Sequence, residues 1–237
     1  MAESAIRDKN FSLYFRLASK NSFLEYTPIY QKVLLLGEKL QYNITTFIDK
    51  KDYKQALILS DLLYQFTPYQ NQASRLKEIT KALMLLEYHI HNHTLYDAIK
   101  TQDQFQLNAN YTIVQELEQQ KNHFFEQQLK LITLKQYSQV YANITPYMKF
   151  IICKNHIASL MKKCYISQFE DAYKKFDRAI DWEKTFKTYL EFFTLDTLLV
   201  KFAKASDKLE ILKTIPTHQE ILLDITTYPA VILVKLP

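Results

Sequence analysis

Glycine is almost missing from this chain: Gly37 is the single glycine among 237 residues. Glycine supplies the positive φ angles and the close backbone approach that phosphate-binding loops, nucleophile elbows and tight hairpins require. The Rossmann fingerprint, the P-loop and the Gly-x-Ser-x-Gly turn each need at least two glycines at fixed spacing. The sequence therefore excludes these three kinds of site and names no reaction.

Arginine and cysteine are also scarce. Arginine occurs only at positions 7, 16, 75 and 178, among 30 basic residues. Codons for glycine, proline and most arginines are GC-rich, whereas those for lysine, asparagine, tyrosine and isoleucine are AT-rich, so this composition is typical of an AT-rich genome. The two cysteines, Cys153 and Cys164, lie in one expected helical region and do not suggest a disulfide framework. We expect the cytoplasm or another reducing intracellular compartment.

Long apolar runs and a secretory leader are lacking as well. The longest apolar runs, such as 82–86 and 230–234, hold five residues, far below the ~18 to 20 residues of a membrane span. The first residues include Glu3 and no apolar stretch of the kind that a secretory signal needs. We therefore expect a soluble, non-secreted protein, with an effector exported without a cleaved signal as an alternative.

Helical periodicity dominates the residues that are present. Hydrophobic residues make up 48% of the chain and charged residues 23%, enough for a sizeable core. Apolar stripes and helix start signals predict helices over about 5–19, 28–48, 52–66, 70–92, from 94, and over 111–134, 135–144, 147–164, 167–181, 183–193 and 196–205. Links this short favour antiparallel neighbours. We predict an all-α fold, an array or bundle of helical hairpins in a single domain (1–237), with a candidate division near 108–110.

The chain changes character near its end, and we expect an extended tail over 216–237. Within it, Ala230–Val234 is the most strongly strand-forming run of the sequence. A lone strand leaves its hydrogen-bonding edges unpaired. The tail could therefore pair with Leu222–Ile225, or associate through Val231 and Leu233 with a partner's sheet or a second copy. The remaining alternative is that the tail belongs to the domain's own core.

One segment carries a repeat-like pattern. Over 51–74, an aromatic residue is followed three positions later by a small one, and the unit closes on proline, as seen in Tyr53, Ala56, Ser60, Leu63 and Pro68. This segment resembles the second helix of a tetratricopeptide repeat. The resemblance implies a stack of helix pairs with a concave face that binds a peptide or a partner helix.

Weaker copies of this pattern, which begin at Tyr137 and Phe176, are spaced differently from the repeats of that family. Neither the interval from Tyr53 to Tyr137 nor that from Tyr137 to Phe176 is a multiple of the tetratricopeptide period of about 34 residues. Ser60 stands where the family prefers an aromatic residue, and Leu63 where it prefers a small one. The alternative reading is an irregular bundle in which Ala56 and Leu63 mark one tightly packed helix pair.

A basic region interleaved with aromatic residues is a candidate for phosphate contact. Its cationic members are Lys162, Lys163, Lys174, Lys175 and Arg178. Lysines with neighbouring aromatic rings are used by nucleic-acid-binding surfaces for phosphate contact and base stacking. The alternative is that aromatic residues at helical spacing face inward and the lysines form an ordinary solvated surface.

Histidines and cysteines offer two weaker candidates. His89 and His93 lie about one helical turn apart, with His91 between them, and could share a metal ion. At a helix end, however, histidines commonly meet the last carbonyl groups. Cys153 and His156 have the spacing of a nucleophile pair, but the apolar surroundings favour a buried structural cysteine beside a capping or surface histidine. We expect no cofactor and no catalytic constellation.

These observations favour a non-catalytic scaffold, adaptor or subunit of a larger assembly that binds other proteins. With a net charge of +5, a nucleic-acid-associated subunit of a ribonucleoprotein is the second hypothesis. A helical enzyme with a site between helices is the third, since such enzymes need no glycine motif. The oligomeric state and the identity of the partner are left open.

Overall fold

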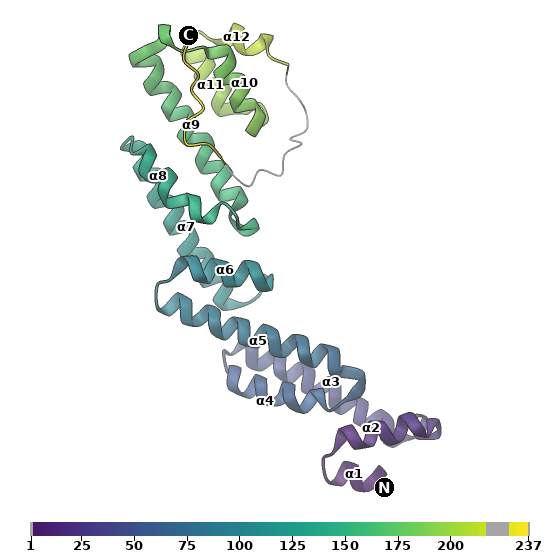
Figure 1. Cartoon of the computed structure of the whole chain (residues 1–237). Coiled ribbons are helices and arrows are strands. Elements are labelled where there is room, and N and C mark those ends of the chain that lie inside the picture. Colours follow the sequence, from purple (N-terminus) through teal and green to yellow (C-terminus); the bar gives the residue numbers. More distant parts are fainter. Residues whose placement is uncertain (1, 217–227, 237) are drawn as a thin grey trace. The chain divides into compact units, whose positions relative to one another are not determined.

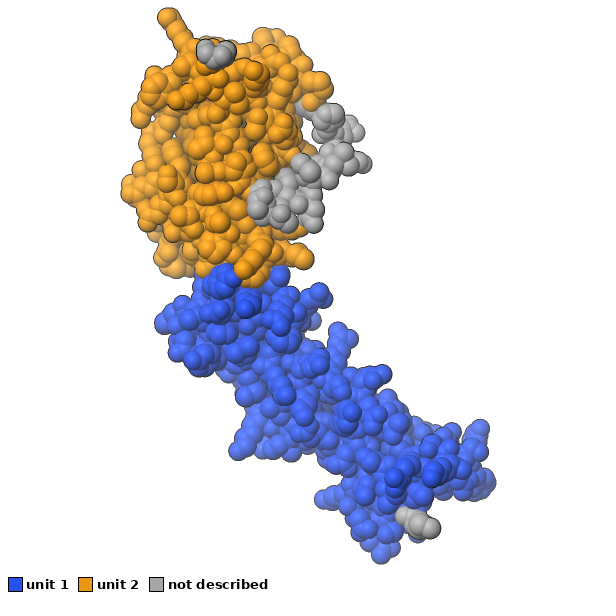
Figure 2. Space-filling view, viewed as in Figure 1, with its two compact units in different colours: residues 1–117 blue, residues 118–237 orange. Residues whose placement is uncertain are grey.

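A computed structural model describes residues 2–216 and 228–236 of the chain (Figure 1). The chain forms two compact units, residues 1–117 and 118–237 (Figure 2). The boundary between these units lies at 117/118, within the helix Thr112–Thr133.

The all-α prediction is confirmed, because the described part of the chain forms helices and no strand. Helices of the first unit are α1 (Ala2–Arg7), α2 (Phe11–Lys20), α3 (Pro28–Asp49), α4 (Tyr53–Tyr64), α5 (Gln70–His91) and α6 (Leu95–Phe105), and α7 (Thr112–Thr133) begins there. Those of the second are α8 (Tyr137–Ile144), α9 (Lys154–Phe176), α10 (Trp182–Phe192), α11 (Thr197–Ala205) and α12 (Leu209–Thr214). Single 3-10 turns lie at Ser22–Tyr26, Thr67–Tyr69, Thr145–Tyr147, Ile151–Cys153 and Asp177–Ala179.

Some expected helix bounds are wrong. The predicted helices over 147–164 and 167–181 are a single helix, α9, which begins at Lys154 and ends at Phe176. Ser167 does not cap a helix, because its hydroxyl lies 2.8 Å from the Tyr137 hydroxyl in a hydrogen bond to α8. A serine can occupy the middle of a helix when its side chain finds such a partner.

The reverse error occurs at the start of the chain. The expected helix over 5–19 is two helices, α1 and α2. Asn10 separates them, since its side-chain carbonyl accepts a hydrogen bond from the Leu13 backbone N–H and caps α2. The short helix α12 was not expected at all.

Helix bounds recur at a constant interval along the chain. Helices α1, α3, α5 and α7 end at residues 7, 49, 91 and 133, and the helices after them begin at 11, 53, 95 and 137. Helices α3, α5, α7 and α9 begin at 28, 70, 112 and 154, again with equal steps. Each step advances the chain by about 42 residues, a length within the range of stacked helical units. Tyr53 and Tyr137 are separated by two of these constant intervals.

The corner between the two helices also recurs. Lys9, Lys51, His93 and Lys135 have φ angles of 54°, 59°, 56° and 62°, the left-handed region. The residue after each corner precedes the next helix, and at Asp52 its carboxylate accepts a hydrogen bond from the Gln55 backbone N–H. The chain thus places lysine and histidine where glycine would be the easiest choice.

Equivalent positions around the corners are buried. Ile48, Ile90 and Ile132 stand three residues before successive corners, and each is nearly inaccessible to solvent. Ala56 and Ala98 hold equivalent positions in α4 and α6, with no exposed surface. Small residues there let a short helix approach its long neighbours closely.

An ion pair at the corner recurs as well. Lys135 pairs with Asp171, 36 residues further along the chain. Lys51 lies 3.8 Å from Glu87, at the same separation in sequence, and 2.7 Å from Glu116. Burial, followed by the nearby carboxylates of Glu87 and Glu116, raises the pKa of Tyr53 to about 12.

The single glycine serves helix packing. Gly37 lies inside α3 and has no positive φ. A Cβ atom there would be 2.5 Å from Cε2 of Tyr69. The Tyr69 hydroxyl donates to the Leu34 carbonyl at 3.2 Å, so the ring is held against this part of α3. Gly37 is therefore explained by close approach.

The second unit is built around α9 and an aromatic core. The Phe169 ring is 5.6 to 6.2 Å, centroid to centroid, from four rings on α10 and α11: Trp182, Phe186, Tyr189 and Phe202. These spacings are typical of edge-to-face and tilted aromatic pairs. Of the aromatic residues in the basic region, Phe150, Tyr165 and Phe169 are buried, whereas Phe176 is exposed.

The described C-terminal tail packs on its own unit and runs beside α9 in Figure 1. Val234 accepts a backbone hydrogen bond from Asp181, and Leu236 donates one to Ala179, each at 2.9 Å. Gln168 donates to the Ala230 carbonyl at 3.1 Å, and Ile232 is 3% exposed. The backbone of the tail therefore forms its hydrogen bonds with residues of the same chain. The expected pairing with Leu222–Ile225 lies outside the described residues.

The first prediction concerns Ala56. Ala56→Trp should lower the free energy of unfolding by about 1 to 3 kcal/mol, because the larger side chain overpacks a site with no exposed surface. Lys54→Trp, on the exposed side of the same helix, is the matched control and should change stability little. Thermal and urea unfolding measure both. Equal midpoints for the two variants would contradict the packed hairpin.

The second prediction concerns the tail. Ile232→Ala should cost about 2 to 5 kcal/mol of unfolding free energy, since it leaves a cavity in the core of the second unit. Val231→Ala, one residue earlier and 58% exposed, should change it by less than about 0.5 kcal/mol. A negligible effect of both variants would show that the tail is not part of this core and would favour its association with another protein.

Candidate functional site

A groove of about 490 Å³ lies between α9 and α11 in the second unit. Each wall is one face of a helix, since its members follow one another at steps of one, three or four residues. The lining residues are Ile166, Glu170, Tyr173 and Lys174 from α9, and Leu198, Lys201, Phe202, Ala205 and Ser206 from α11 and its C-terminal cap. Its base is apolar, because Ile166 and Phe202 are buried in the core below.

Asp196 holds α11 against α9. Its Oδ1 atom accepts hydrogen bonds from the backbone N–H groups of Leu198 and Leu199, each at 3.0 Å, and so caps the helix. Its Oδ2 atom accepts from the Tyr189 hydroxyl at 2.7 Å and lies 3.3 Å from Nζ of Lys162. Burial and this hydrogen bond raise the pKa of Tyr189.

Positive charge faces the groove from both walls. Lys174 and Lys201 are exposed and form no ion pair within the described residues, and Glu170 is the single carboxylate in the lining. Residues 118–237 contain 17 Lys and Arg and 13 Asp and Glu. The second unit therefore carries four of the five net positive charges of the chain.

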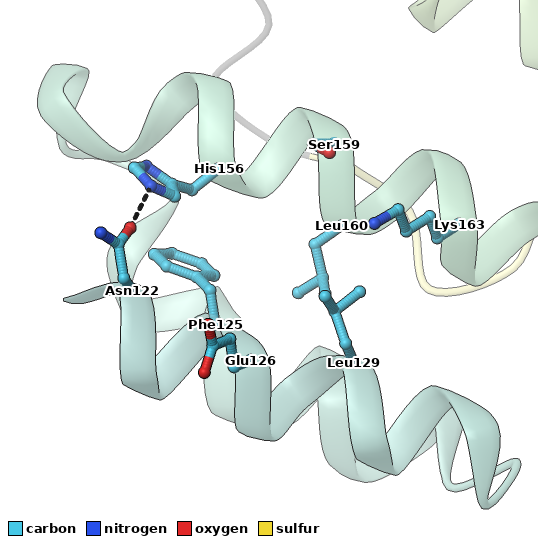
Figure 3. Close-up of a pocket in the computed structure, with 8 residues that line it drawn as sticks. All are labelled: Asn122, Phe125, Glu126, Leu129, His156, Ser159, Leu160 and Lys163. Atoms are coloured by element: carbon cyan, nitrogen blue, oxygen red, sulfur yellow. Dashed lines mark hydrogen bonds between the residues drawn. The ribbon is translucent and has the colours of Figure 1, made fainter. Parts of the chain in front are cut away.

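A smaller pocket of about 250 Å³ lies between α7 and α9 (Figure 3). It is lined by Asn122, Phe125, Glu126, Leu129, His156, Ser159, Leu160 and Lys163. The imidazole of His156 stacks on the Phe125 ring with 4.9 Å between centroids and 15° between planes. Nε2 of His156 donates to Oδ1 of Asn122 at 3.0 Å.

The surroundings of His156 favour its neutral form. An amide oxygen only accepts, so Nε2 carries the proton, and Nδ1 is buried with no hydrogen-bond partner among the described residues. Burial lowers the pKa of His156, and the Lys121 ammonium lowers it further, against an opposing effect of Glu118. Lys121 itself is 1% exposed and pairs with Glu118 at 2.6 Å. The pocket thus joins α7 to α9 through one stacked ring pair and one side-chain hydrogen bond.

The structure does not gather the five basic residues into one patch. Lys163 lines the small pocket and Lys174 the groove, on separate parts of α9. Lys162 is paired with Asp196 and lies over the Phe193 ring. Lys175 and Arg178 are exposed near the end of α9. Adjacent helical residues point about 100° apart, which separates Lys162 from Lys163 and Lys174 from Lys175.

The histidine sequence lies at the C-terminal end of α5. Nδ1 of His91 hydrogen-bonds the Glu87 carbonyl at 2.8 Å, and Nδ1 of His89 lies 3.0 Å from Oγ1 of Thr94. His93 is the left-handed corner residue. Throughout the described ranges, no three His, Cys, Asp or Glu side chains are grouped so as to hold a metal ion.

Cys153 and His156 form no hydrogen bond with each other, because Nε2 of His156 bonds to Asn122 from α7 and its Nδ1 has no hydrogen-bond partner among the described residues. Both cysteines are buried, and burial raises the pKa of the Cys164 thiol to about 11. In the tail, Val231 is exposed and Leu233 is half-buried.

The α11 wall of the groove was missed by the sequence reasoning. Its signal was the spacing of Leu198, Lys201 and Ala205, which places them on one ridge of a helix. That spacing alone does not say which helix faces the ridge.

Comparison with known proteins identified no matching family model, curated protein or solved structure. Over the described ranges, the helices are all too short or too polar to cross a membrane.

The third prediction is a pH dependence. Because the folded state lowers the pKa of His156 below its usual value, the unfolded chain binds the proton more readily. The stability that depends on neutral His156 is present above the unfolded pKa of about 6.5 and falls as the pH drops below it. Between about pH 7.5 and pH 5, the melting temperature should fall further for the natural chain than for His156→Gln. Parallel pH profiles would contradict the burial of a neutral imidazole.

Proposed function

We propose that this chain is a non-catalytic protein-binding array of helical hairpins, acting as a scaffold, an adaptor or a subunit of a larger assembly. One observation carries the proposal: helix ends, helix starts and left-handed corners recur at the constant interval, with helix ends at 7, 49, 91 and 133. Chains built from successive helix pairs bury each pair against its neighbours. Such arrays characteristically present an extended surface for binding.

Equivalent exposed positions in two successive pairs support a binding role. Tyr42 on α3 and Met84 on α5 are one constant interval apart and are 71% and 42% exposed. Lys39 and Lys81 precede them by three residues in the same helices and are also exposed. Tyr88, one turn beyond Met84, is 63% exposed. Tyrosine and methionine are both enriched at protein interfaces.

A polynucleotide-binding role draws less support from the same structure. The lysines that would contact phosphate are divided among the groove, the small pocket and an ion pair with Asp196. Phosphate-backbone binding needs several cations that follow one path. Phe169 and its neighbouring rings, which could have stacked on bases, are buried in the core.

The fourth prediction tests the proposed function. The full chain, immobilised and incubated with an extract of its native cells, should retain one or a few proteins in nearly stoichiometric amounts. Retention should survive nuclease treatment. It should be weakened by the pair Tyr42→Ala and Met84→Ala, since these side chains offer the recurring exposed surface. Lys54→Ala and Lys100→Ala, exposed on the short helices, are the matched control pair.

Nucleic acid supplies the contrasting outcome. If phosphate contacts dominate, capture should vanish on nuclease treatment, and purified chain should bind RNA with an affinity that falls steeply with salt. Each phosphate-binding lysine changed to alanine would then reduce the slope by about 0.7 to 0.9. That behaviour, or the absence of any stoichiometric protein, would contradict the protein-binding proposal.

A further inference from the structure

We propose that the groove between α9 and α11 binds a short segment of a partner protein in which an apolar side chain is flanked by carboxylates. This inference rests on the proposed function, to which it adds a second binding location and the chemistry of the segment bound there.

The base of the groove calls for an apolar side chain. Phe202 and Ile166 are 5% and 8% exposed, and Leu198 and Tyr173 line the groove beside them. Ala205 ends the α11 wall with a small side chain. Filling such a site with an apolar group removes apolar surface from water on both partners.

The rims call for negative charge. Lys174 lies on one wall and Lys201 on the other, and neither has an ion-pair partner within the described residues. Glu170 lies one turn before Lys174, so the two cations outnumber the one carboxylate. A ligand with carboxylates on both sides of its apolar anchor would match this arrangement and would associate faster for it.

The dimensions favour a peptide over an acyl chain. From Ile166 to Lys174 the α9 wall spans eight residue steps, or about 12 Å at 1.5 Å per residue. That length accommodates about two turns of a helix or four residues of an extended segment. The groove of about 490 Å³ extends along this length between the two helices and is open to solvent. A long acyl chain requires an enclosed cavity, because each methylene left in water forfeits its transfer free energy.

The experiment selects peptides from a random dodecapeptide library displayed on phage, using the immobilised full chain. Selected phage are then counted on the double variant Lys174→Glu with Lys201→Glu. The most enriched peptide is synthesised, labelled and titrated by fluorescence anisotropy against the natural chain and each variant. We expect the enriched peptides to share an apolar residue with aspartate or glutamate nearby on both sides.

Two kinds of variant test the location. Reversing both lysine charges should weaken binding of the peptide about tenfold, since the new glutamates then face the carboxylates of the peptide. Ala205→Trp should abolish binding by filling the groove, and circular dichroism checks that it remains folded. The matched control is Lys204→Glu, which is exposed on the same helix but outside the lining. It should bind the peptide as tightly as the natural chain.

Three results would overturn the inference. They are no enriched peptide, enriched peptides without carboxylates, or a peptide that Ala205→Trp and the charge-reversed variant bind as tightly as the natural chain does. The native-extract capture separates this failure from that of the proposed function. If any of these results occurs while the native-extract capture still retains a stoichiometric partner, the groove is refuted as a docking site and the protein-binding role is left intact.

Discussion

The left-handed corner between a long helix and the short helix after it is the constraint on which this architecture depends. At Lys51, for example, the backbone turns at φ 59°, after α3 ends at residue 49 and before α4 begins at 53. This conformation costs an L-residue about 1 to 2 kcal/mol. The cost is tolerated because Ile48 is buried on one side of the corner and Asp52 caps the next helix on the other. A corner of fixed length then makes the two helices antiparallel neighbours.

The recurring ion pairs contribute less than the corners beside which they lie. The side chains of Lys51 and Glu87 retain 31% and 27% of their exposure. Pairs this accessible contribute about 0 to 1 kcal/mol. The equivalent pair of Lys135 with Asp171 therefore indicates that the same helix faces meet at both corners. Stability at the corners is supplied by buried side chains such as Ile48 and Ile132.

The corner after α9 is built differently. Asp177, one constant interval after Lys135, has φ −45° and lies in a 3-10 turn. Its carboxylate accepts a hydrogen bond from Nε1 of Trp182 at 2.7 Å and forms an ion pair with Lys208 at 3.1 Å. The extra length before α10 leaves the backbone of Ala179 and Asp181 free to pair with the tail. Beyond this departure from the interval comes α11, whose contact with α9 forms the groove.

Much of the helical fold could be predicted from periodicity and caps. The Thr27 and Asp52 signals start the helices that the structure shows. Ser167 misled the prediction because a serine within a helix and a serine cap look alike until Tyr137 is placed. The spacing from Tyr53 to Tyr137 was visible in the sequence, but it equals two constant intervals and no multiple of the roughly 34 residues of a tetratricopeptide repeat. The groove and the partnership of His156 with Asn122 depend on contacts between helices, which one sequence does not specify.

Deletion of one whole interval tests the recurrence of the helix pairs most directly. A chain that lacks residues 70–111 joins the end of one hairpin to the start of α7 in register. It should keep its helical circular dichroism per residue and unfold cooperatively, because α7 takes the place of α5. A matched deletion of residues 70–103, shorter by eight, breaks the register and should lose both properties. If the two deletions are equally folded or equally unfolded, the constant interval is not a structural repeat.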